Sequence, residues 1–579
     1  MNKRLITRLL LLSGSVAFLA ATGLAGFLTA HVIGFYDKPY FNYFEDLGNS
    51  VADGWEELFI INERADLNIS SIFTSLYGSV VYIPKPDRKG SGGAVTSWGQ
   101  YIVVMTHEGK IYFVDQNLNH ALSNIAAPFN GYEDYVEAAT KPPFDEADYA
   151  FRRFRYNDIA QFVSHGRRGF LVSYTKYHKE KHCYTNTISR LYIGTSDEEI
   201  VSTPIVSNLW TDIYETNPCL PLKRQLNAIE GHMAGGRMVF DGDRTVYLAS
   251  GDYHWDGLAG PRTAPGTNPE TAPAVAQDPA TDYGKVLAID VETGKARQVS
   301  RGHRNMQGIA LDRAGRVWVV EHGVRGGDEL NLVIEGENYG WPLESYGTKY
   351  SGKPLRGVVS FGRKEQFRRP KVAWLPSIAV SGLMRIEGFH RAWDGDLLAA
   401  TLKGKMLVRI HIADGQVIYS EYIDVGNAIR HVHQHSDGRI VLWMSDKRLI
   451  VLSPALGNLG WEYVRARLST MEADEDVVRR VRKTIHACME CHSLDPAENT
   501  YAPSLANIFG APIGSTKYRG YSEALLSDRR IWTREILAEY LSDPQSAIPG
   551  TTMAEPGISE KIVLEKTIDI LEGLATDTK

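Results

Sequence analysis

Short apolar runs alternate with tight polar turns through most of the chain, from about residue 70 to residue 454. Each unit consists of an apolar run, a polar turn that ends in glycine, and a second apolar run. Such units predict β-hairpins, because glycine tolerates the positive φ that tight turns require. Clear instances lie at residues 101–114, 238–249, 309–320 and 429–443.

Hairpins spaced irregularly over nearly four hundred residues predict the blades of a β-propeller. Radial packing of the blades covers the sheets and leaves only short exposed edges. A pair of β-sandwiches is the alternative, but it would need an internal linker, and the sequence offers no clear one. We therefore expect a mainly β domain over residues 70–454.

The N-terminus carries Lys3, Arg4 and Arg8, followed by a nearly uncharged apolar run from residue 9 to about residue 35. This run is long enough to cross a bilayer once as a helix. A cleaved signal peptide is the alternative, although its apolar part is usually only about 7–15 residues long. We expect an uncleaved anchor at residues 1–36 and a connector at 37–69. The basic residues precede the span, so the rest of the chain should face the periplasm.

Composition adds three expectations. At 579 residues the chain is too long for one compact core, and 53 glycines with 10% aromatic residues favour strands and turns. The net charge of −6 and the lack of a basic stripe argue against nucleic acid as a partner. Cys183 and Cys219 can pair in an oxidising compartment, which predicts a disulfide; two unpaired buried thiols are the alternative.

Residues 488–492 read Cys-Met-Glu-Cys-His, a spacing typical of covalent haem attachment. Cys488 and Cys491 would each bind the porphyrin, and His492 would be the first axial ligand of the iron. A zinc half-site or a redox dithiol is the alternative, but no cysteine follows Cys491. Met553 lies downstream in a loop rich in proline and glycine and is the predicted second axial ligand. A thioether opposite histidine raises the iron potential, which suits an electron acceptor.

From residue 474 onward the chain resembles a class I cytochrome c, so we expect an all-α domain at 474–579 and a linker at 455–473. Further similarity lies at residues 502–510 and 521–525. A closing amphipathic helix is expected to begin at a serine cap, Ser559. Its apolar positions are Ile562, Val563, Ile568, Leu571 and Leu574.

Polar motifs at residues 301–308, 321–331 and 338–342 interrupt strand ends, where a propeller presents its binding face. Here the chain resembles the soluble PQQ-dependent sugar dehydrogenases, the aldose sugar dehydrogenase and soluble glucose dehydrogenase type, most clearly over residues 229–446. The resemblance implies a six-bladed propeller that holds pyrroloquinoline quinone (PQQ) on a calcium ion. A cofactor with three carboxylates needs fixed cations and a hard metal held by oxygen atoms.

The resemblance also assigns residues to the cofactor site. It implies that PQQ is contacted by Arg304, Asn305, Tyr350, Lys403 and Arg430. The carbonyls of Gly323 and Val324 would hold the catalytic calcium, and Glu329 with the Tyr339 carbonyl would hold a second, structural one. His232, ahead of a double glycine, is the expected general base that takes the hydroxyl proton of the substrate.

Together these features predict a membrane-anchored periplasmic quinohaemoprotein dehydrogenase. It would oxidise a sugar or a polyol-type alcohol and pass electrons through haem c to a respiratory acceptor. One alternative is a non-catalytic propeller that serves as a docking module for an electron-transfer cytochrome. Ala428 stands where the resemblance expects an arginine, and His232 is three positions before the glycines instead of two. A second alternative, a reductase, would need another haem or a copper site, for which the sequence offers no residue cluster.

Overall fold

The computed structural model describes residues 66–577, except for 73, 85–89, 198, 225–226, 259, 356–365, 455–457, 490, 495–501, 507, 517 and 554–556. The predicted N-terminal anchor and nearly all of the connector therefore lie outside the described residues. Within the described part of the chain, no helix has both the length and the apolar character needed to span a bilayer.

Six antiparallel sheets follow one another along the chain. The first is formed by β3 (Ala94–Trp98), β4 (Tyr101–Met105), β5 (Ile111–Val114) and β6 (His120–Leu122). The second is formed by β7 (Tyr156–Ser164), β8 (Arg167–His178), β9 (Cys183–Tyr192), β10 (Thr211–Glu215) and the short β11 (Leu220–Pro221). The third is formed by β12 (Gly235–Phe240), β13 (Thr245–Ser250), β14 (Lys285–Asp290) and β15 (Ala296–Arg301).

The remaining sheets complete the set. The fourth contains β16 (Met306–Leu311), β17 (Val317–Glu321), β18 (Asp328–Leu332) and β19 (Val372–Trp374). The fifth contains β20 (Val380–Arg385), β21 (Leu397–Thr401), β22 (Met406–Ala413) and β23 (Gln416–Asp424). The sixth contains β24 (Ile429–Gln434), β25 (Ile440–Met444), β26 (Arg448–Pro454), β2 (Ser75–Tyr82) and β1 (Asp66–Ser70). Two helices, α3 (Tyr132–Ala139) and α4 (Asp148–Phe151), lie between the first and second sheets in the sequence.

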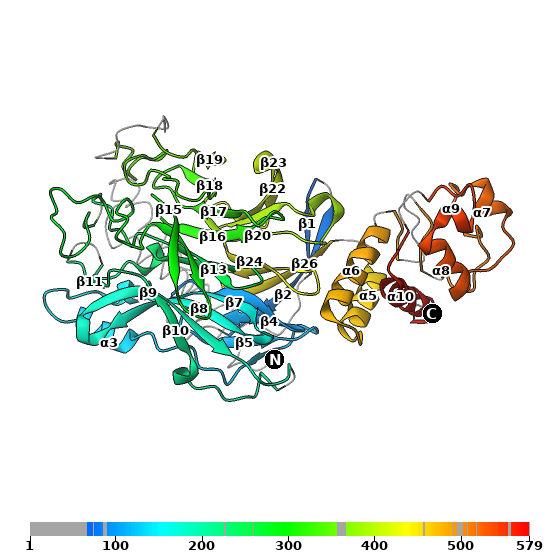
Figure 1. Cartoon of the computed structure of the whole chain (residues 1–579), viewed down its shortest axis with the longest axis horizontal. Helices are drawn as coiled ribbons and strands as arrows, with labels where there is room; N and C mark the ends of the chain where they lie inside the picture. Colours follow the sequence, from blue (N-terminus) through cyan, green and yellow to red (C-terminus); the bar gives the residue numbers. More distant parts are fainter. Residues whose placement is uncertain are drawn as a thin grey trace, which may run out of the picture. The chain divides into compact units, whose positions relative to one another are not determined.

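The innermost strands of the six sheets form a closed ring. β3, β7, β12, β16, β20 and β24 contact one another in that order, and β24 contacts β3 again. The predicted six-bladed propeller is therefore confirmed (Figure 1). Apolar side chains fill the space between blades: Phe162 and Leu171 of the second blade pack against Leu248 and Leu287 of the third.

All four predicted hairpins are present as β4–β5, β12–β13, β16–β17 and β24–β25. The β12–β13 turn shows why the sequence forms them. Asp241 Oδ1 accepts hydrogen bonds from the backbone amides of Asp243, Arg244 and Thr245. Gly242 adopts a φ of +88°, which is strained for a residue with a Cβ atom.

The last blade is built from both ends of the propeller sequence. β2 pairs with β26 from Leu76 opposite Pro454 to Tyr82 opposite Arg448, and β1 pairs with β2 at the outer edge. β1 includes residues that we assigned to the connector at 37–69. Joining an early strand to the late strands closes the ring through a sheet, so the ring does not depend on contacts between side chains alone.

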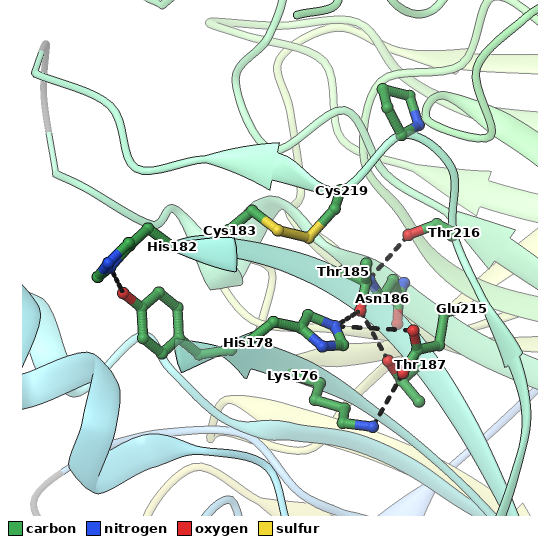
Figure 2. Close-up of a disulfide and its surroundings, with 12 residues drawn as sticks. Lys176, His178, His182, Cys183, Thr185, Asn186, Thr187, Glu215, Thr216 and Cys219 are labelled. Carbon is green, nitrogen blue, oxygen red and sulfur yellow. Dashed lines mark hydrogen bonds and ion pairs between the residues drawn. A yellow bond between two sulfur atoms is a disulfide. The ribbon is translucent and has the colours of Figure 1, made fainter. Parts of the chain in front are cut away.

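The predicted disulfide is confirmed. Cys183, the first residue of β9, is bonded to Cys219 (Figure 2). β11 follows Cys219 directly and pairs with β9 at Tyr184 and Cys183. The bond therefore fastens a long connection, which lies between β10 and β12 in the sequence, to the second blade.

The C-terminal helices are α5 (Asn458–Ser469), α6 (Glu475–Met489), α7 (Glu523–Ser527), α8 (Arg534–Ser542), α9 (Pro544–Ala547) and α10 (Lys561–Asp577). They share one apolar core, to which Trp461, Ile485, Leu537 and Ile568 contribute. α5 was predicted as linker, but Trp461 and Val464 make it part of this core.

The closing helix differs in detail from its prediction. It begins at Lys561, two residues after Ser559. Val563, Ile568, Leu571 and Leu574 are buried as expected. Ile562 is 40% exposed. Successive residues of a helix are about 100° apart around its axis, which places Ile562 outside the face that the other four share.

Candidate functional site

His232 lies in a short 3-10 helix, Gly231–Met233, immediately before the innermost strand of the third blade. Its Nδ1 is 3.0 Å from Oε2 of Glu230, a buried carboxylate. Arg153 Nη1 and Asn227 Nδ2 donate to the same carboxylate at 2.8 Å and 2.7 Å. Glu230 is thus fixed from several sides and fixes the imidazole in turn.

The electrostatics of this pair suit a proton acceptor. Burial lowers the pKa of His232 to about 4, although the adjoining Glu230 carboxylate opposes the shift. Burial alone would raise the pKa of Glu230, but its contacts with His232 and Arg153 hold that pKa below its usual value. At neutral pH the imidazole is therefore uncharged, and the carboxylate can stabilise the proton that it accepts.

A second histidine lies beside the first. The rings of His232 and His254 are 5.8 Å apart, edge to face. Tyr253 and His254 both adopt left-handed backbone conformations, with φ of 50° and 59°, which is rare for two consecutive residues with side chains. Their neighbour Asp252 accepts hydrogen bonds from the His254 amide and from the Trp341 indole, at 2.8 Å and 2.7 Å. Burial raises the pKa of Asp252 to about 6.

Arg304 and Asn305 lie next to this cluster, as the sequence predicted. Asn305 Nδ2 donates to the carbonyl of His232 at 3.3 Å. The Arg304 guanidinium lies 5.2 Å from the ring centre of Trp341 and donates to the Gly323 carbonyl at 2.5 Å. Arg304 Nε is buried and has no hydrogen-bond partner within the described part of the chain, so the guanidinium retains donor capacity for a ligand.

Buried polar contacts hold this segment in place. Glu321 accepts hydrogen bonds from the Arg304 amide at 2.8 Å and from Asn331 Nδ2 at 2.9 Å, and His303 Nδ1 lies 2.9 Å away. The His303 ring stacks on Tyr339 with ring centres 4.5 Å apart. These residues position Arg304.

Three further predicted cofactor residues lie in different surroundings. Arg430 lies in β24, and its Nε donates to Ser445 Oγ at 3.0 Å. Lys403 is exposed in the turn after β21. Tyr350 is 75% exposed, and its carbonyl accepts a hydrogen bond from Arg325 at 2.9 Å. The described contacts thus bring Arg304 and Asn305 together with His232, but they do not bring Lys403 or Tyr350 to the same cluster.

The residues expected to hold calcium lie in the fourth blade and its loops. The Gly323 carbonyl faces Arg304, and Val324 forms a bridge with Gly326. Glu329, in β18, is buried and accepts a hydrogen bond from Asn331 at 3.0 Å. The Tyr339 hydroxyl donates to the Leu332 carbonyl at 2.5 Å.

A different group has metal-binding spacing. Ligand atoms of Glu230, His232 and His254 lie within 4.8 Å of one another. Two nitrogen ligands are unsuited to calcium, which prefers oxygen. The group was missed at the sequence level, although Glu230 precedes His232 by only two residues. His254 lies too far along the chain for its proximity to be predicted.

The haem motif lies at the end of α6. Cys488 is in the last turn of the helix, and the amides of Cys491 and His492 donate to its carbonyl at 3.3 Å and 3.0 Å. His492 Nδ1 lies 2.6 Å from the Pro503 carbonyl, an arrangement in which Nδ1 carries the proton and Nε2 keeps its lone pair for iron. Met553 packs against the same apolar core as Cys488. These residues fit a covalently bound haem with histidine and methionine as axial ligands.

Known proteins resemble two separate segments of the chain. Residues 220–452 match the glucose/sorbosone dehydrogenase family. Over 247 residues the chain is 30% identical to the aldose sugar dehydrogenase of Escherichia coli, covering 39% of this chain and 61% of that protein. Over 121 residues it is 33% identical to quinoprotein glucose dehydrogenase B of Acinetobacter calcoaceticus, covering 18% of this chain and 25% of that protein. The chain thus spans less than two thirds of the length of these relatives.

The second resemblance covers most of a whole protein. Over 87 residues the chain is 30% identical to cytochrome c2 iso-2 of Magnetospirillum molischianum, covering 15% of this chain and 90% of that protein. The chain therefore belongs to the cytochrome c family through its C-terminal domain, and joins that domain to a propeller with a glucose/sorbosone dehydrogenase segment.

Proposed function

We propose that this chain is a quinoprotein sugar dehydrogenase that carries its own haem electron acceptor. The observation that supports this most is the position of a half-buried histidine, held by a buried carboxylate, beside an arginine with unused donor capacity. His232 and Glu230 supply the base, and Asn305 connects it to Arg304. The names of the Escherichia coli and Acinetobacter relatives support a sugar substrate and a quinone cofactor.

His232 would act on the substrate hydroxyl. In the tautomer with its proton on Nδ1, towards Glu230, the Nε2 lone pair can accept the hydroxyl proton. The Glu230 carboxylate then stabilises the imidazolium that forms. PQQ, when bound, supplies the acceptor for the two electrons that leave the substrate carbon together with hydrogen.

The cofactor's carboxylates would be held by arginines. Nε of Arg304 has no hydrogen-bond partner among the described residues, and Arg430, which is half-buried, is the second arginine that we assign to the cofactor. Lys403 and Tyr350 are proposed to approach the cofactor from the exposed rim. The carbonyls of Gly323 and Val324 are proposed calcium ligands, and Glu329 with the Tyr339 carbonyl would hold a second ion.

The haem domain would take electrons from the propeller one at a time and pass them to a respiratory acceptor. Tethering gives donor and acceptor a high effective concentration. We further propose that residues 1–36 anchor the protein to the inner membrane with both domains in the periplasm. The Cys183–Cys219 disulfide supports an oxidising compartment.

Haem reduction provides the test. The full chain, purified with haem, is mixed with PQQ, Ca²⁺ and a panel of sugars and polyols while the haem spectrum is followed. We expect reduction only when PQQ and a substrate are both present, and a loss of at least about 100-fold in rate for His232→Ala. PQQ binding without haem reduction by any sugar or alcohol would contradict the proposal.

A docking propeller without chemistry remains the second candidate, since Tyr350 is exposed and position 428 is alanine. Equilibrium titration with PQQ distinguishes the dehydrogenase from the docking propeller, because a docking propeller should not bind PQQ saturably.

A further inference from the structure

A narrow pocket lies on the propeller axis, beside the cluster around His232. Every blade contributes to it through its innermost strand or the residues just before that strand. The lining residues are Gly92, Arg155, Asn157, Gly235, Arg237, Gln307, Ser381 and Arg430. Gln307 Nε2 also donates to Asn305 Oδ1 at 2.7 Å, which links the pocket to the predicted cofactor residues.

Three arginines from three blades converge in this pocket. Arg237 has a carboxylate partner, Asp158, at 3.5 Å. The side-chain contacts of the other two are neutral in the described part of the chain: Arg155 donates to Asn157 Oδ1 and the Ser91 carbonyl, at 3.3 Å and 3.2 Å, and Arg430 donates to Ser445 Oγ. Among the described residues, the pocket thus holds three guanidinium groups and one neighbouring carboxylate.

This arrangement is unfavourable without an anion. Burial, and then the charges of Arg430 and Arg237, lower the pKa of Arg155 to about 9. Burial and the charge of Arg237 lower the pKa of Arg430 to about 10. Buried cations that face one another destabilise a fold unless a counter-charge enters.

The pocket also contains a neutral hydrogen-bond donor, the side-chain amide of Asn157. Asn157 is 4% exposed, and its Nδ2 has no hydrogen-bond partner among the residues that the structure describes. Buried amide donors are nearly always satisfied in folded proteins. An oxygen-bearing anion in the pocket would satisfy Nδ2 and the surrounding guanidinium groups together.

We propose that this axial pocket binds a carboxylate group of the cofactor, and that Arg155 is a binding residue for it. This inference rests on the proposed function. Arg155 adds positive charge to a site in which position 428 is alanine. The narrow lining suits a small anionic group such as one carboxylate of a larger ligand.

Two binding measurements on the apo full chain test the proposal. PQQ affinity is measured by quenching of tryptophan fluorescence, and a small dianion, oxalate, is tested by its effect on the melting temperature. The variants are Arg155→Gln and Arg155→Lys, and the matched control is Arg297→Gln, whose arginine is 52% exposed and paired with Glu335.

We expect Arg155→Gln to weaken PQQ binding by about 10-fold or more, since a charge-assisted hydrogen bond contributes roughly that factor. Arg155→Lys should retain part of the affinity, and Arg297→Gln should retain all of it. Oxalate should raise the melting temperature of the wild type but not of Arg155→Gln. Without ligand, Arg155→Gln should melt no lower than the wild type, because it removes an unpaired buried charge. A purely structural arginine would lower it.

The outcomes separate this inference from the proposed function. Unchanged PQQ affinity in Arg155→Gln overturns the role of Arg155 and leaves the dehydrogenase proposal intact. If the wild type binds oxalate through Arg155 but does not bind PQQ, the anion pocket stands and the quinone function fails. Absence of both responses in the wild type overturns both.

Discussion

The charged residues near the centre of the propeller differ in how the surrounding protein compensates their charges. Glu230 is fully partnered by Arg153, Asn227 and His232. Arg155 is surrounded by neutral groups and other arginines. The first arrangement fixes a base in one orientation, whereas the second leaves room for a negatively charged ligand.

The Glu230–His232 pair predicts a pH dependence. The pKa of His232 is about 4, below its ordinary value of 6.5, so the base is active above about pH 5. Glu230→Gln removes the carboxylate that opposes this lowering, so the pKa should fall further. We expect the acid limb of the kcat/KM profile to move to lower pH, and kcat to fall about 10-fold because the imidazolium is less stabilised.

The control for this variant is Glu335→Gln, since the Glu335 side chain is 70% exposed. It should leave the profile unchanged. An acid limb that stays in place in Glu230→Gln would show that Glu230 does not act on the base. The same depressed pKa affects stability: between pH 6.5 and 4 the unfolded chain binds a proton at His232 that the native chain does not bind, so acidification should destabilise the fold.

At the scale of elements, each blade is a regular antiparallel sheet, and the connections between strands carry several of the candidate site residues. The loop between β13 and β14 starts with two left-handed residues and carries His254 to His232. The buried Lys285 fastens its far end by donating to the carbonyls of Val275 and Tyr283 at 2.9 Å and 2.8 Å. These contacts hold both ends of the long connection, and its first part brings His254 to the site.

The Cys183–Cys219 disulfide should stabilise one such connection. The two residues are 36 positions apart, and closing a loop of this length contributes about 4 kcal/mol by the chain-entropy estimate. Replacing both with serine should lower the free energy of unfolding of the propeller by up to that amount. Urea denaturation followed by tryptophan fluorescence checks this. Cys488 and Cys491 stay unchanged, so the haem spectrum should be unaffected.

Over the whole molecule, the chain joins a propeller with a glucose/sorbosone dehydrogenase segment to a cytochrome c domain. Under the proposed function, the propeller would carry out two-electron chemistry and the cytochrome one-electron transfer. The two functions can be tested separately, because their residues lie far apart in the sequence: His232 on the propeller, and His492 and Met553 on the cytochrome.

Met553→Ala should affect only the second function. Loss of a thioether ligand lowers the reduction potential of the haem, which disfavours its acceptance of electrons. We expect slower sugar-dependent haem reduction, while sugar oxidation with an artificial dye as acceptor continues at the wild-type rate. Equal losses in both assays would contradict the assignment of Met553 as an iron ligand. Potentiometric titration of the haem supplies the independent measurement.

Local patterns in the sequence were sufficient for much of this protein. The hairpins around Gly109 and Gly242 follow from turn chemistry, and the haem motif follows from the spacing of Cys488, Cys491 and His492, because these interactions act within a few residues. The irregularly spaced hairpins over nearly four hundred residues indicated a propeller, and the resemblance supplied the number of blades.

Only the tertiary structure decided which distant residues meet. Arg155, Arg237 and Arg430 come from three blades, and no short-range pattern connects them. β2 pairs with β26, which lies almost the whole length of the propeller sequence away, and β1 extends the same sheet through β2. The physical reason is ring closure: radial packing brings one innermost strand from every blade to a common axis, so the charge at the centre is a property of the closed ring and not of any single segment.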